Sequence, residues 1–435
     1  MVDTLVAALV YIVPFFGGLM LFTLSRRKAE KRATNAWQES VEAGLTEPTS
    51  LHPHIDLSLC CGSGACVTAC PEETVIGLID GKAVVVDPTA CIGHGACAAA
   101  CPTHAITLVF GTEKRGVELP VVTPQFETNV PGLFIAGELG GMGLIRNAIT
   151  QGVQAMDSIS KLSGMRRGDR LDVLIVGAGP AGFAASLAAK EKGLRYATIE
   201  QETFGGTVSH FPRGKLVMTA PAKLPIVGEM RFREVSKETL LRFWDDAKKQ
   251  AAIEISYEEQ LLGLERDGDG FIARTSRGNH KTRAVLRSIG RRGTPRKLGV
   301  TGEEMPMVMY RLVDAAQFAG QRVLVIGGGD SALEAAATIS EETDAIVDLS
   351  YRSEAFQRAK RKNRQRVDDA AAAGRLTVRL STQVQSITKS AVTLKTGSGP
   401  IELPNDAIIV CAGGVLPTDF LKSLGISTTT KFGVA

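Results

Sequence analysis

Two short runs of cysteines could carry electrons in this chain of 435 residues. Both have the spacing C-x5-C-x3-C-P, with Cys60, Cys66, Cys70 and Pro71 in the first run and Cys91, Cys97, Cys101 and Pro102 in the second. Thiolates that leave a tight, glycine-rich loop at such spacings can converge on an iron–sulfur cluster, and the last cysteine of each run serves the other run's cluster. Structural zinc usually takes separated C-x2-C pairs, and disulfides need an oxidising compartment. The runs therefore indicate two iron–sulfur clusters and one-electron transfer.

Both runs resemble the bacterial dicluster ferredoxin pattern C-x2-C-x2-C-x3-C-P, except that its second cysteine is replaced. Ser63 occupies that position in the first run and His94 in the second. Each cluster then has three cysteines, namely Cys60, Cys66 and Cys101 for one and Cys91, Cys97 and Cys70 for the other. Similar ferredoxins hold a 3Fe–4S cluster in such a site. Alternatively, a 4Fe–4S cluster takes a fourth ligand from His94, Ser63 or the neighbouring Cys61, or Ser63 and His94 are loop residues that ligate nothing.

Further along the chain, residues 173–182 read as a buried strand, a glycine turn and the start of a helix. In this pattern the first glycine makes the turn, the second lets the backbone approach a pyrophosphate, and the third lets helix and strand pack closely. The helix N-terminus favours the anion, and an acidic residue after the next strand can bind ribose hydroxyls. The predicted contacts of this dinucleotide site are Gly177, Gly179, Pro180, Ala181, Gly182 and Glu200.

A second glycine turn of the G-x-G-x-x-A kind follows at residues 323–332. The strand after it, residues 346–350, has no acidic residue where an NAD-selective site would carry one, and basic residues follow instead. Basic side chains suit a 2′-phosphate, so NADPH is favoured over NADH; the alternative is a solvated basic helix. The predicted contacts here are Gly327, Gly329, Asp330, Ser331, Arg352 and Arg358.

Two such turns in series resemble the two-domain thioredoxin-reductase-like flavoproteins, including their ferredoxin–NADP reductase and bacillithiol-disulfide reductase branches. The resemblance covers residues 120–435 and implies FAD as the flavin and NAD(P)H as the hydride donor. The segments that carry it are residues 204–207, where Gly205, Gly206 and Thr207 would contact the flavin, and residues 289–295 and 411–417, which would cross between the domains. The thiols that perform dithiol exchange in two of these branches are missing, so that chemistry is not expected.

The order of the parts departs from this family, in which the segment that closes over the flavin follows the nicotinamide domain. Its likeness here, residues 128–156, precedes the first glycine turn. We interpret this order as a circular permutation, which is feasible where termini lie close together. Alternatively, residues 128–156 are a strand and a helix of the ferredoxin domain. The cofactor contacts expected in the segment are Gly137, Glu138, Asn147 and Ala148.

The N-terminal residues 4–25 are uncharged and mostly apolar. As a helix they span ~30 Å, the thickness of one bilayer core. Basic residues follow directly, which places the rest of the chain in the cytoplasm by the positive-inside rule. A signal peptide would carry positive charge before its apolar part. We therefore expect a single-pass anchor in the inner (cytoplasmic) membrane, followed by a polar helical spacer.

The sequence thus predicts an α/β protein with two Rossmann-like dinucleotide-binding domains, a small α+β ferredoxin-like dicluster domain and one N-terminal transmembrane helix. The expected parts are the anchor (1–25), the spacer (26–56), the ferredoxin-like domain (57–110), the closing segment (111–165), the FAD domain (166–295), the NAD(P)H domain (296–417) and a return to the FAD domain (418–435).

This architecture predicts an FAD-dependent NAD(P)H oxidoreductase that exchanges electrons with a redox protein or a small electron acceptor or donor. Hydride transfer needs no acid–base residue from the protein. One alternative is a flavin-site reductase of a small molecule or disulfide, fed by the clusters. Another is a non-catalytic redox-sensing membrane module. Lys and Arg (50) nearly balance Asp and Glu (46), which does not indicate a nucleic-acid partner, and a homodimer is compatible with the sequence.

Overall fold

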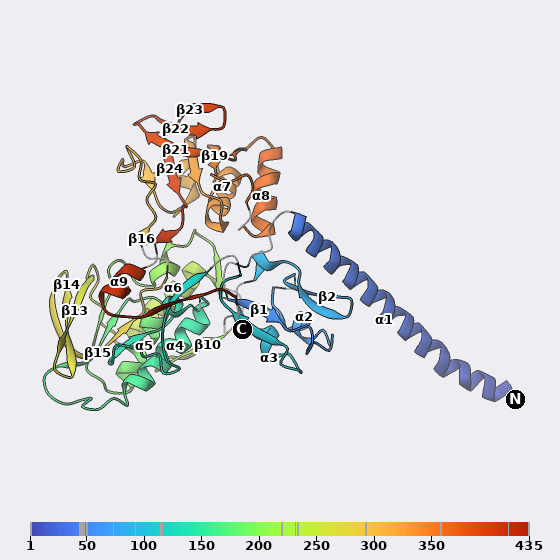
Figure 1. The fold of residues 1–435 in the computed structure, drawn as a ribbon, viewed down its shortest axis with the longest axis horizontal. Coiled ribbons are helices and arrows are strands. Elements are labelled where there is room, and N and C mark those ends of the chain that lie inside the picture. Colours follow the sequence, from blue (N-terminus) through green and yellow to red (C-terminus); the bar gives the residue numbers. More distant parts are fainter. Residues whose placement is uncertain are drawn as a thin grey trace. The chain divides into compact units, whose positions relative to one another are not determined.

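The computed structural model forms two compact units, Met1–Arg115 with Phe432–Ala435, and Gly116–Lys431 (Figure 1). The residues that the structure describes are 2–42, 48, 51–72, 74–91, 93–113, 116–141, 143–218, 221–230, 232, 235–291, 294–356, 359–415 and 417–433. For residues 2–14, 218 and 294 it describes the backbone only.

The first unit folds its two cysteine runs as a near-repeat. Each run contains a short helix, α2 or α3, that carries the run's middle cysteine. The strand before the first run, β1, pairs antiparallel with the strand after the second run, β4, and the hairpin β2–β3 lies between the runs in sequence. The runs thereby meet around one small core. The elements are β1 (His52–Ile55), α2 (Ala65–Ala69), β2 (Ile76–Ile79), β3 (Lys82–Val85), η1 (Pro88–Ala90), α3 (Ala96–Ala99) and β4 (Ile106–Val109).

The long helix α1 (Val2–Glu42) packs its later part on the β2–β3 hairpin. Ala33 is buried there, and a Cβ atom on Gly77 would lie 2.5 Å from the Cβ of Ala33, so the contact requires glycine. Glu30 Oε1 accepts a hydrogen bond from the amide of Asp80 at 2.8 Å. The segment predicted as a polar helical spacer therefore also packs on the cluster unit. The sequence of this segment alone does not reveal the docking, because the partner hairpin comes much later in the chain.

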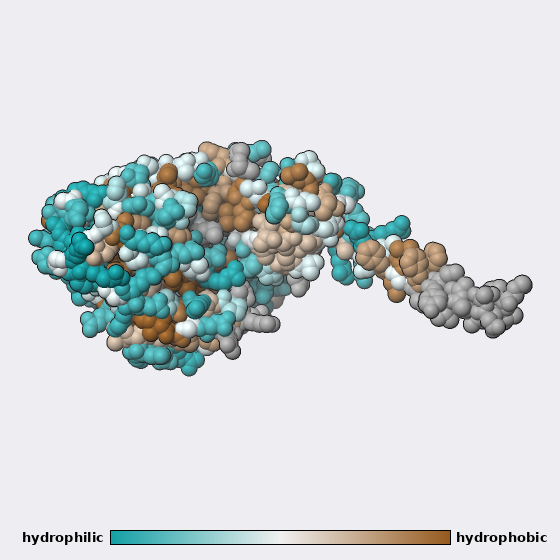
Figure 2. Space-filling view, turned by 90° about the horizontal axis from the view of Figure 1, so that it is seen from below, coloured by the Kyte–Doolittle hydropathy of each residue, from teal (hydrophilic) through white to brown (hydrophobic). Residues whose placement is uncertain are grey.

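The apolar part of α1 lies partly among residues whose side chains are not described. Its described apolar side chains are exposed and form the brown stretch of helix beside the grey atoms in Figure 2: Phe15, Phe16, Leu19, Met20, Leu21, Phe22 and Leu24. Over the part of the chain described with side chains, no helix is both long and apolar enough to cross a membrane.

The second unit begins with a sheet of order β13-β14-β15-β7-β8, in which β6 also pairs with β15. Strands β6, β7 and β8 and the end of β15 run parallel, so their carboxyl ends share one edge, where dinucleotides bind in such sheets. Helices α4 and α5 pack closely because a Cβ on Gly152 would overlap the carbonyl of Ala181. The elements are β6 (Leu133–Ile135), α4 (Ile145–Ile159), β7 (Leu171–Val176), α5 (Pro180–Glu191), β8 (Tyr196–Ile199), α6 (Lys237–Gln250), β13 (Leu261–Asp267), β14 (Gly270–Thr275) and β15 (Gly278–Arg287).

A second parallel sheet has the order β17-β24-β18-β19-β20, with a three-stranded sheet β21-β22-β23 beside it in sequence. Its core consists of the inward faces of β18, β19 and β24 and of the helix α7, whose alanines allow close approach to the sheet. The elements are β17 (Val308–Met309), η4 (Ala315–Phe318), β18 (Arg322–Ile326), α7 (Asp330–Glu342), β19 (Ile346–Ser350), α8 (Arg361–Ala372), β20 (Leu376–Arg379), β21 (Gln383–Ile387), β22 (Ala391–Thr396), β23 (Gly399–Pro404) and β24 (Ala407–Val410).

Two strand pairs join distant parts of this unit. The pair β16–β25 brings together the two segments predicted to cross between the domains. The pair β5–β26 brings the start of the unit next to its end, with Val117 opposite Lys431. The remaining elements are β5 (Val117–Pro120), η2 (Glu138–Gly140), η3 (Gly206–His210), β9 (Leu216–Met218), β10 (Ala222–Leu224), β11 (Gly228–Met230), β12 (Val235–Ser236), β16 (Thr294–Pro295), β25 (Gly414–Val415), α9 (Thr418–Ser423) and β26 (Thr428–Lys431).

Candidate redox sites

The six cysteines predicted as cluster ligands form two trios, each lining its own hollow. In each trio the last cysteine of one run joins the first two of the other, which is the predicted crossing. The trios are Cys70, Cys91 and Cys97, around a hollow of about 340 Å³, and Cys60, Cys66 and Cys101, around one of about 290 Å³. Among the described residues, no three His, Cys, Asp or Glu side chains converge as they would on a single metal ion. A multi-iron cluster differs in that each thiolate binds its own iron, and the trios fit that requirement.

Glycines give both runs the same backbone path. Gly64 and Gly95 adopt left-handed φ angles of 76° and 80° immediately before α2 and α3, a conformation that favours glycine. Two residues earlier, Gly62 and Gly93 have φ angles of 66° and 75°, and a Cβ on either would crowd a carbonyl oxygen of a neighbouring segment. The loops can therefore wrap closely around a bound group.

The thiols have unequal affinities for protons. Burial raises the pKa of the Cys97 thiol to about 11, and burial also raises the pKa of Cys66 and Cys70. At Cys101 slight burial acts in the same direction, but hydrogen bonds from Thr103 and from backbone amides outweigh it and lower the pKa. Metal binding displaces these protons, so assembly of the buried trio releases protons at neutral pH.

Backbone amides already point at two of the sulfur atoms. Ala83 N donates to Cys60 Sγ at 3.4 Å, and Ala105 N donates to Cys101 Sγ at 3.3 Å. Such hydrogen bonds tune the potential of a cluster. Lys82 Nζ also donates to the carbonyl of Cys60 at 2.7 Å and holds this loop. The cysteine pattern does not predict Lys82, because its spacing concerns only the ligands.

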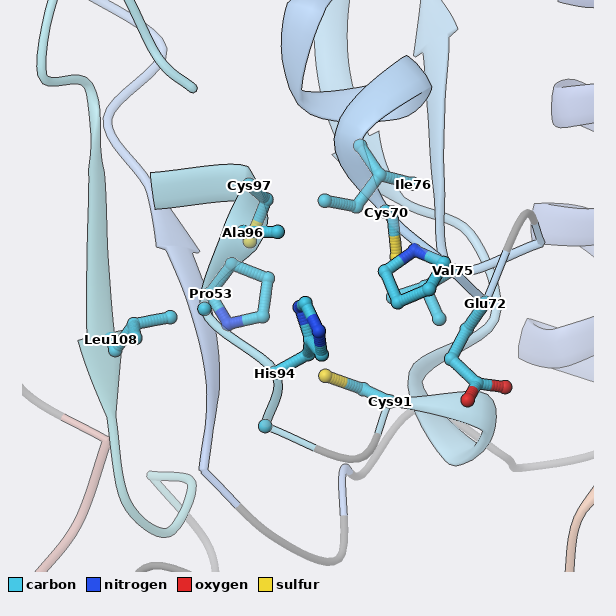
Figure 3. Close-up of a pocket in the computed structure, with 13 residues that line it drawn as sticks. Pro53, Cys70, Glu72, Val75, Ile76, Cys91, His94, Ala96, Cys97 and Leu108 are labelled. Carbon is cyan, nitrogen blue, oxygen red and sulfur yellow. The ribbon is translucent and has the colours of Figure 1, made fainter. Parts of the chain in front are cut away.

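The residues at the two replaced cysteine positions lie differently. Ser63 is exposed, and its Oγ accepts a weak hydrogen bond from the amide of Ala65 at 3.4 Å. His94 is half-buried and lines the hollow of the trio that contains Cys97 (Figure 3). Cys61 is exposed at the rim of the other hollow.

The first glycine turn of the second unit has the geometry of a pyrophosphate cradle. Gly177 has a φ of 104°, and a Cβ on Gly182 would overlap the carbonyl oxygen of Gly177, so both positions require glycine. Gly179 is the last residue before α5, and Pro180 begins that helix without removing a useful amide. The N-terminus of α5 thus lies directly after the turn, where it can stabilise a phosphate anion.

The acidic residue predicted for the ribose lies at this turn. Glu200 is buried, and its carboxylate accepts hydrogen bonds from the amide of Ala178 at 2.7 Å and of Glu202 at 2.9 Å. Each carboxylate oxygen can accept a second hydrogen bond, so the group can still bind ribose hydroxyls. The amides fix its orientation.

Residues from four separate segments meet beside the turn. A Cβ on Gly137 would lie 3.0 Å from Cβ of Ala181, and one on Gly206 would lie 3.0 Å from Cα of Gly179. A Cβ on Gly290 would lie 3.8 Å from Thr207 Oγ1 and 4.0 Å from Glu138 Oε2. The other predicted contacts are Gly205, which has a left-handed φ of 94°, and Asn147 and Ala148 in the first turn of α4. These close approaches place the backbones of the segments next to one another beside the glycine turn, where the sequence predicts the dinucleotide.

A buried arginine lies at the same sheet edge. Arg287 ends β15 between β6 and β7 and is 1% exposed. Its guanidinium lies over the ring of Phe420 at 4.5 Å, and Nε and Nη1 have no hydrogen-bond partner among the described residues. Burial lowers its pKa to about 10, so it is still charged at neutral pH. The cation–π contact compensates part of the cost of desolvation.

The second glycine turn lies at the carboxyl edge of the second sheet. Gly327 has a φ of 145°, and a Cβ there would lie 2.5 Å from the carbonyl oxygen of Cys411. A side chain on Gly328 would overlap the ring of Tyr351, which covers the turn. The glycine pattern does not predict this role of Tyr351, because the pattern specifies only the turn itself. Cys411 follows β24 and is half-buried.

The other residues predicted for the nicotinamide cofactor divide into two groups. Asp330 Oδ1 accepts hydrogen bonds from the amide of Lys360 and from Asn363 Nδ2, both at 2.8 Å, so it holds the basic segment at the turn. Ser331 and Arg352 are exposed beside the turn and can reach a ligand. Arg358 lies outside the described residues.

A substitution at Gly329 can test whether this turn binds a cofactor. This glycine has an extended backbone, and a Cβ there would meet no atom within 4 Å. We therefore expect Gly329→Ala to weaken NADPH binding at least about tenfold, because only the cofactor would meet the new methyl group. The free energy of unfolding should stay constant or rise by up to about 1 kcal/mol, since alanine restricts the unfolded chain. Titration with NADPH measures the change in affinity, and thermal melting measures the change in stability. A loss of stability as large as the loss of binding free energy would contradict the assignment of this turn to the cofactor.

Comparisons with known proteins assign a family to each of the two parts of the chain. Residues 174–433 match the family model described as "Pyridine nucleotide-disulphide oxidoreductase", and residues 52–102 match that of a "4Fe-4S dicluster domain". The chain is 30% identical to a ferredoxin–NADP reductase of Ignicoccus hospitalis over 60% of this chain and 83% of that protein. It is 30% identical to one of Streptococcus agalactiae over 56% and 73%.

Solved structures show the same fold for the second unit. The bacillithiol disulfide reductase of Staphylococcus aureus superposes with a TM-score of 0.53 and 21% identity, covering 60% of this chain and 81% of that chain. The same enzyme from Bacillus cereus gives 0.53 and 19%, with coverages of 60% and 82%. At this identity the likeness concerns the fold alone.

Proposed function

Since the chain belongs to the pyridine nucleotide-disulphide oxidoreductase family, we propose that it transfers electrons between NADPH, FAD and two iron–sulfur clusters and exchanges them with a redox partner. The family and the dicluster domain together make it an NAD(P)H-dependent flavoprotein oxidoreductase with an iron–sulfur domain. The observation that carries the proposal is the presence in one chain of two thiol trios around hollows and two glycine turns at parallel sheet edges.

When bound, the flavin accepts a hydride and releases single electrons, and the clusters carry single electrons. The residues of the chain bind and orient these groups. The turn from Gly177 to Gly182 and Glu200 would hold the FAD, and the turn at Gly327 with Tyr351 would hold the nicotinamide cofactor. The basic residues after β19 would select NADPH through its 2′-phosphate.

Dithiol exchange is not part of the proposal. The one cysteine in Gly116–Lys431 is Cys411, so no cysteine pair exists in that unit. The bacillithiol-disulfide reductase branch carries a cysteine inside its first glycine turn. In this chain that position is Ala181, which is buried at the start of α5. A reductase acting on a disulfide would therefore need another route.

We also propose that the second unit is circularly permuted. Residues 128–156 belong to the second unit: β6 pairs with β15 of the sheet that carries the first glycine turn, and α4 packs on α5. The pairing of β5 with β26 supports the idea, because it brings the two ends of the unit together. The family match begins only at residue 174, after the closing segment.

We further propose that α1 attaches the protein to the inner membrane, with both units on the cytoplasmic side. The exposed apolar side chains from Phe15 to Leu24 support attachment, because soluble surfaces rarely expose so many large apolar groups together. Basic residues at positions 26–28 follow the apolar stretch. Residues 4–14, which carry half of the apolar stretch, lie outside the residues described with side chains. Washing isolated membranes with high salt and then with detergent tests this attachment.

Purification of the full chain tests the function. The expected preparation contains FAD, iron and acid-labile sulfide, and NADPH reduces the flavin and then the clusters faster than NADH does. Cluster reduction is followed by low-temperature EPR. A colourless protein without flavin would support the non-catalytic membrane module instead. Substrate-dependent NADPH oxidation that survives loss of a cluster would support a flavin-site reductase.

A further inference from the structure

His94 and Ser63 occupy equivalent places in the two cysteine runs. Both are flanked by glycines with left-handed φ angles, so the same loop presents both residues. The difference therefore lies in the side chains. The Ser63 hydroxyl is exposed and bonds to the adjacent amide of Ala65, whereas the imidazole of His94 reaches the neighbouring hollow.

Figure 3 shows the imidazole of His94 pointing into the hollow, with the sulfur atoms of Cys70, Cys91 and Cys97 around it. Of the described residues that line this hollow, only Glu72 and His94 carry a further side chain that can bind iron. The Glu72 carboxylate points away from the three sulfur atoms in the same view. The remaining lining groups are glycine, alanine, proline and aliphatic side chains.

We propose that His94 is the fourth ligand of the cluster held by Cys70, Cys91 and Cys97, and that Ser63 does not ligate the other cluster. The inference rests on one part of the proposed function, namely that the cysteine trios hold iron–sulfur clusters. Imidazole replaces thiolate in other iron–sulfur centres, so the chemistry has precedent. The two clusters are then inequivalent: one has a nitrogen ligand and the other does not.

The nitrogen ligand has an electronic consequence. A neutral imidazole in place of an anionic thiolate lowers the negative charge of the cluster, so an added electron is opposed less. The cluster with His94 should therefore have a higher reduction potential than the same cluster with four cysteines. Changing this one ligand provides the comparison within a single protein environment.

Pulsed EPR of the dithionite-reduced full chain labelled with ¹⁵N-histidine tests the ligand directly. We expect a nitrogen hyperfine coupling in the wild type that is absent in His94→Cys and retained in the matched control His54→Ala, whose side chain is exposed on β1. His94→Cys should keep the iron content and lower the potential of one cluster. His94→Ala should lose about one iron atom per chain and show a 3Fe–4S signal in the oxidised protein.

Ser63→Ala serves as the mirror control and should leave iron content and spectra unchanged. A wild type that contains iron but shows no nitrogen coupling, or a His94→Ala variant with unchanged spectra, would overturn the ligand assignment and leave the proposed function intact. A preparation without iron would overturn the proposed function itself. A coupling that persists in His94→Cys would assign the ligand to another histidine.

Discussion

Replacing Cys97 with alanine is expected to remove one cluster while NADPH still reduces the flavin. In an assay with cytochrome c added as the electron acceptor, most electron transfer from NADPH should stop. Cys97 is a buried member of its trio, so water cannot easily replace its thiolate as a ligand. Iron and sulfide per flavin should fall by about half, because one of two clusters is lost. The rate of cytochrome c reduction should fall about 100-fold or more. Even mutation of a residue that only hydrogen-bonds to a metal ligand lowers metal affinity or activity by up to about 100-fold.

The matched control is Cys411→Ala. This thiol is half-buried beside the second glycine turn and belongs to neither trio, so its removal should leave the iron content unchanged. Separate measurement of flavin bleaching by NADPH locates the defect in the cluster unit. Unchanged iron content in Cys97→Ala would refute Cys97 as a cluster ligand, and lost flavin reduction would show that the clusters are needed upstream of the flavin.

Local patterns explain why much of both sites could be predicted. A glycine turn specifies its strand, its left-handed residue and its helix start within a few residues, so Gly177, Gly182 and Gly327 lie where the fingerprint requires. The cysteine crossing is also readable, because the pseudo-repeat of the runs forces the last cysteine of each toward the other. The dicluster domain and the oxidoreductase family confirm the enzyme class expected from these patterns.

Contacts between distant segments could not be predicted in this way. Tyr351 covers Gly328, Glu30 accepts a hydrogen bond from Asp80, and both contacts depend on how separate elements pack. The local sequence around Arg287 likewise does not show that its guanidinium lies over a phenylalanine of α9. Asp330 is similar: its position marks the turn, while its hydrogen bonds show that it positions the basic segment.

The ion pair between Lys215 and Glu334, at 2.6 Å, is another such contact. Lys215 precedes β9, which pairs with β12, and Glu334 lies on α7, which packs on the second parallel sheet. The side chains are 32% and 21% exposed, so the pair contributes at most about 1 kcal/mol to stability.

Gly182→Ala is expected to remove FAD from the protein. The new Cβ would overlap the carbonyl oxygen of Gly177 and would lie 2.6 Å from Ser288 Oγ. Ser288 cannot yield easily, because its hydroxyl shares its one proton between the carbonyl oxygens of Val176 and Gly177, at 3.0 and 3.1 Å. Forcing this turn apart costs about 3 kcal/mol, which corresponds to roughly 100-fold weaker FAD binding.

The measurement is the flavin content of the purified variant together with FAD titration of the deflavinated protein. Gly263→Ala is the matched control, since this glycine lies in strand β13 of the same unit and a Cβ there would meet no atom within 4 Å. The cluster unit should be unaffected, because both residues belong to the second unit, so iron content separates a local defect from general misfolding. A Gly182→Ala variant that retains iron but has lost FAD would show that this turn, and not the fold as a whole, holds the flavin. Full flavin content in that variant would mean that the cofactor binds elsewhere.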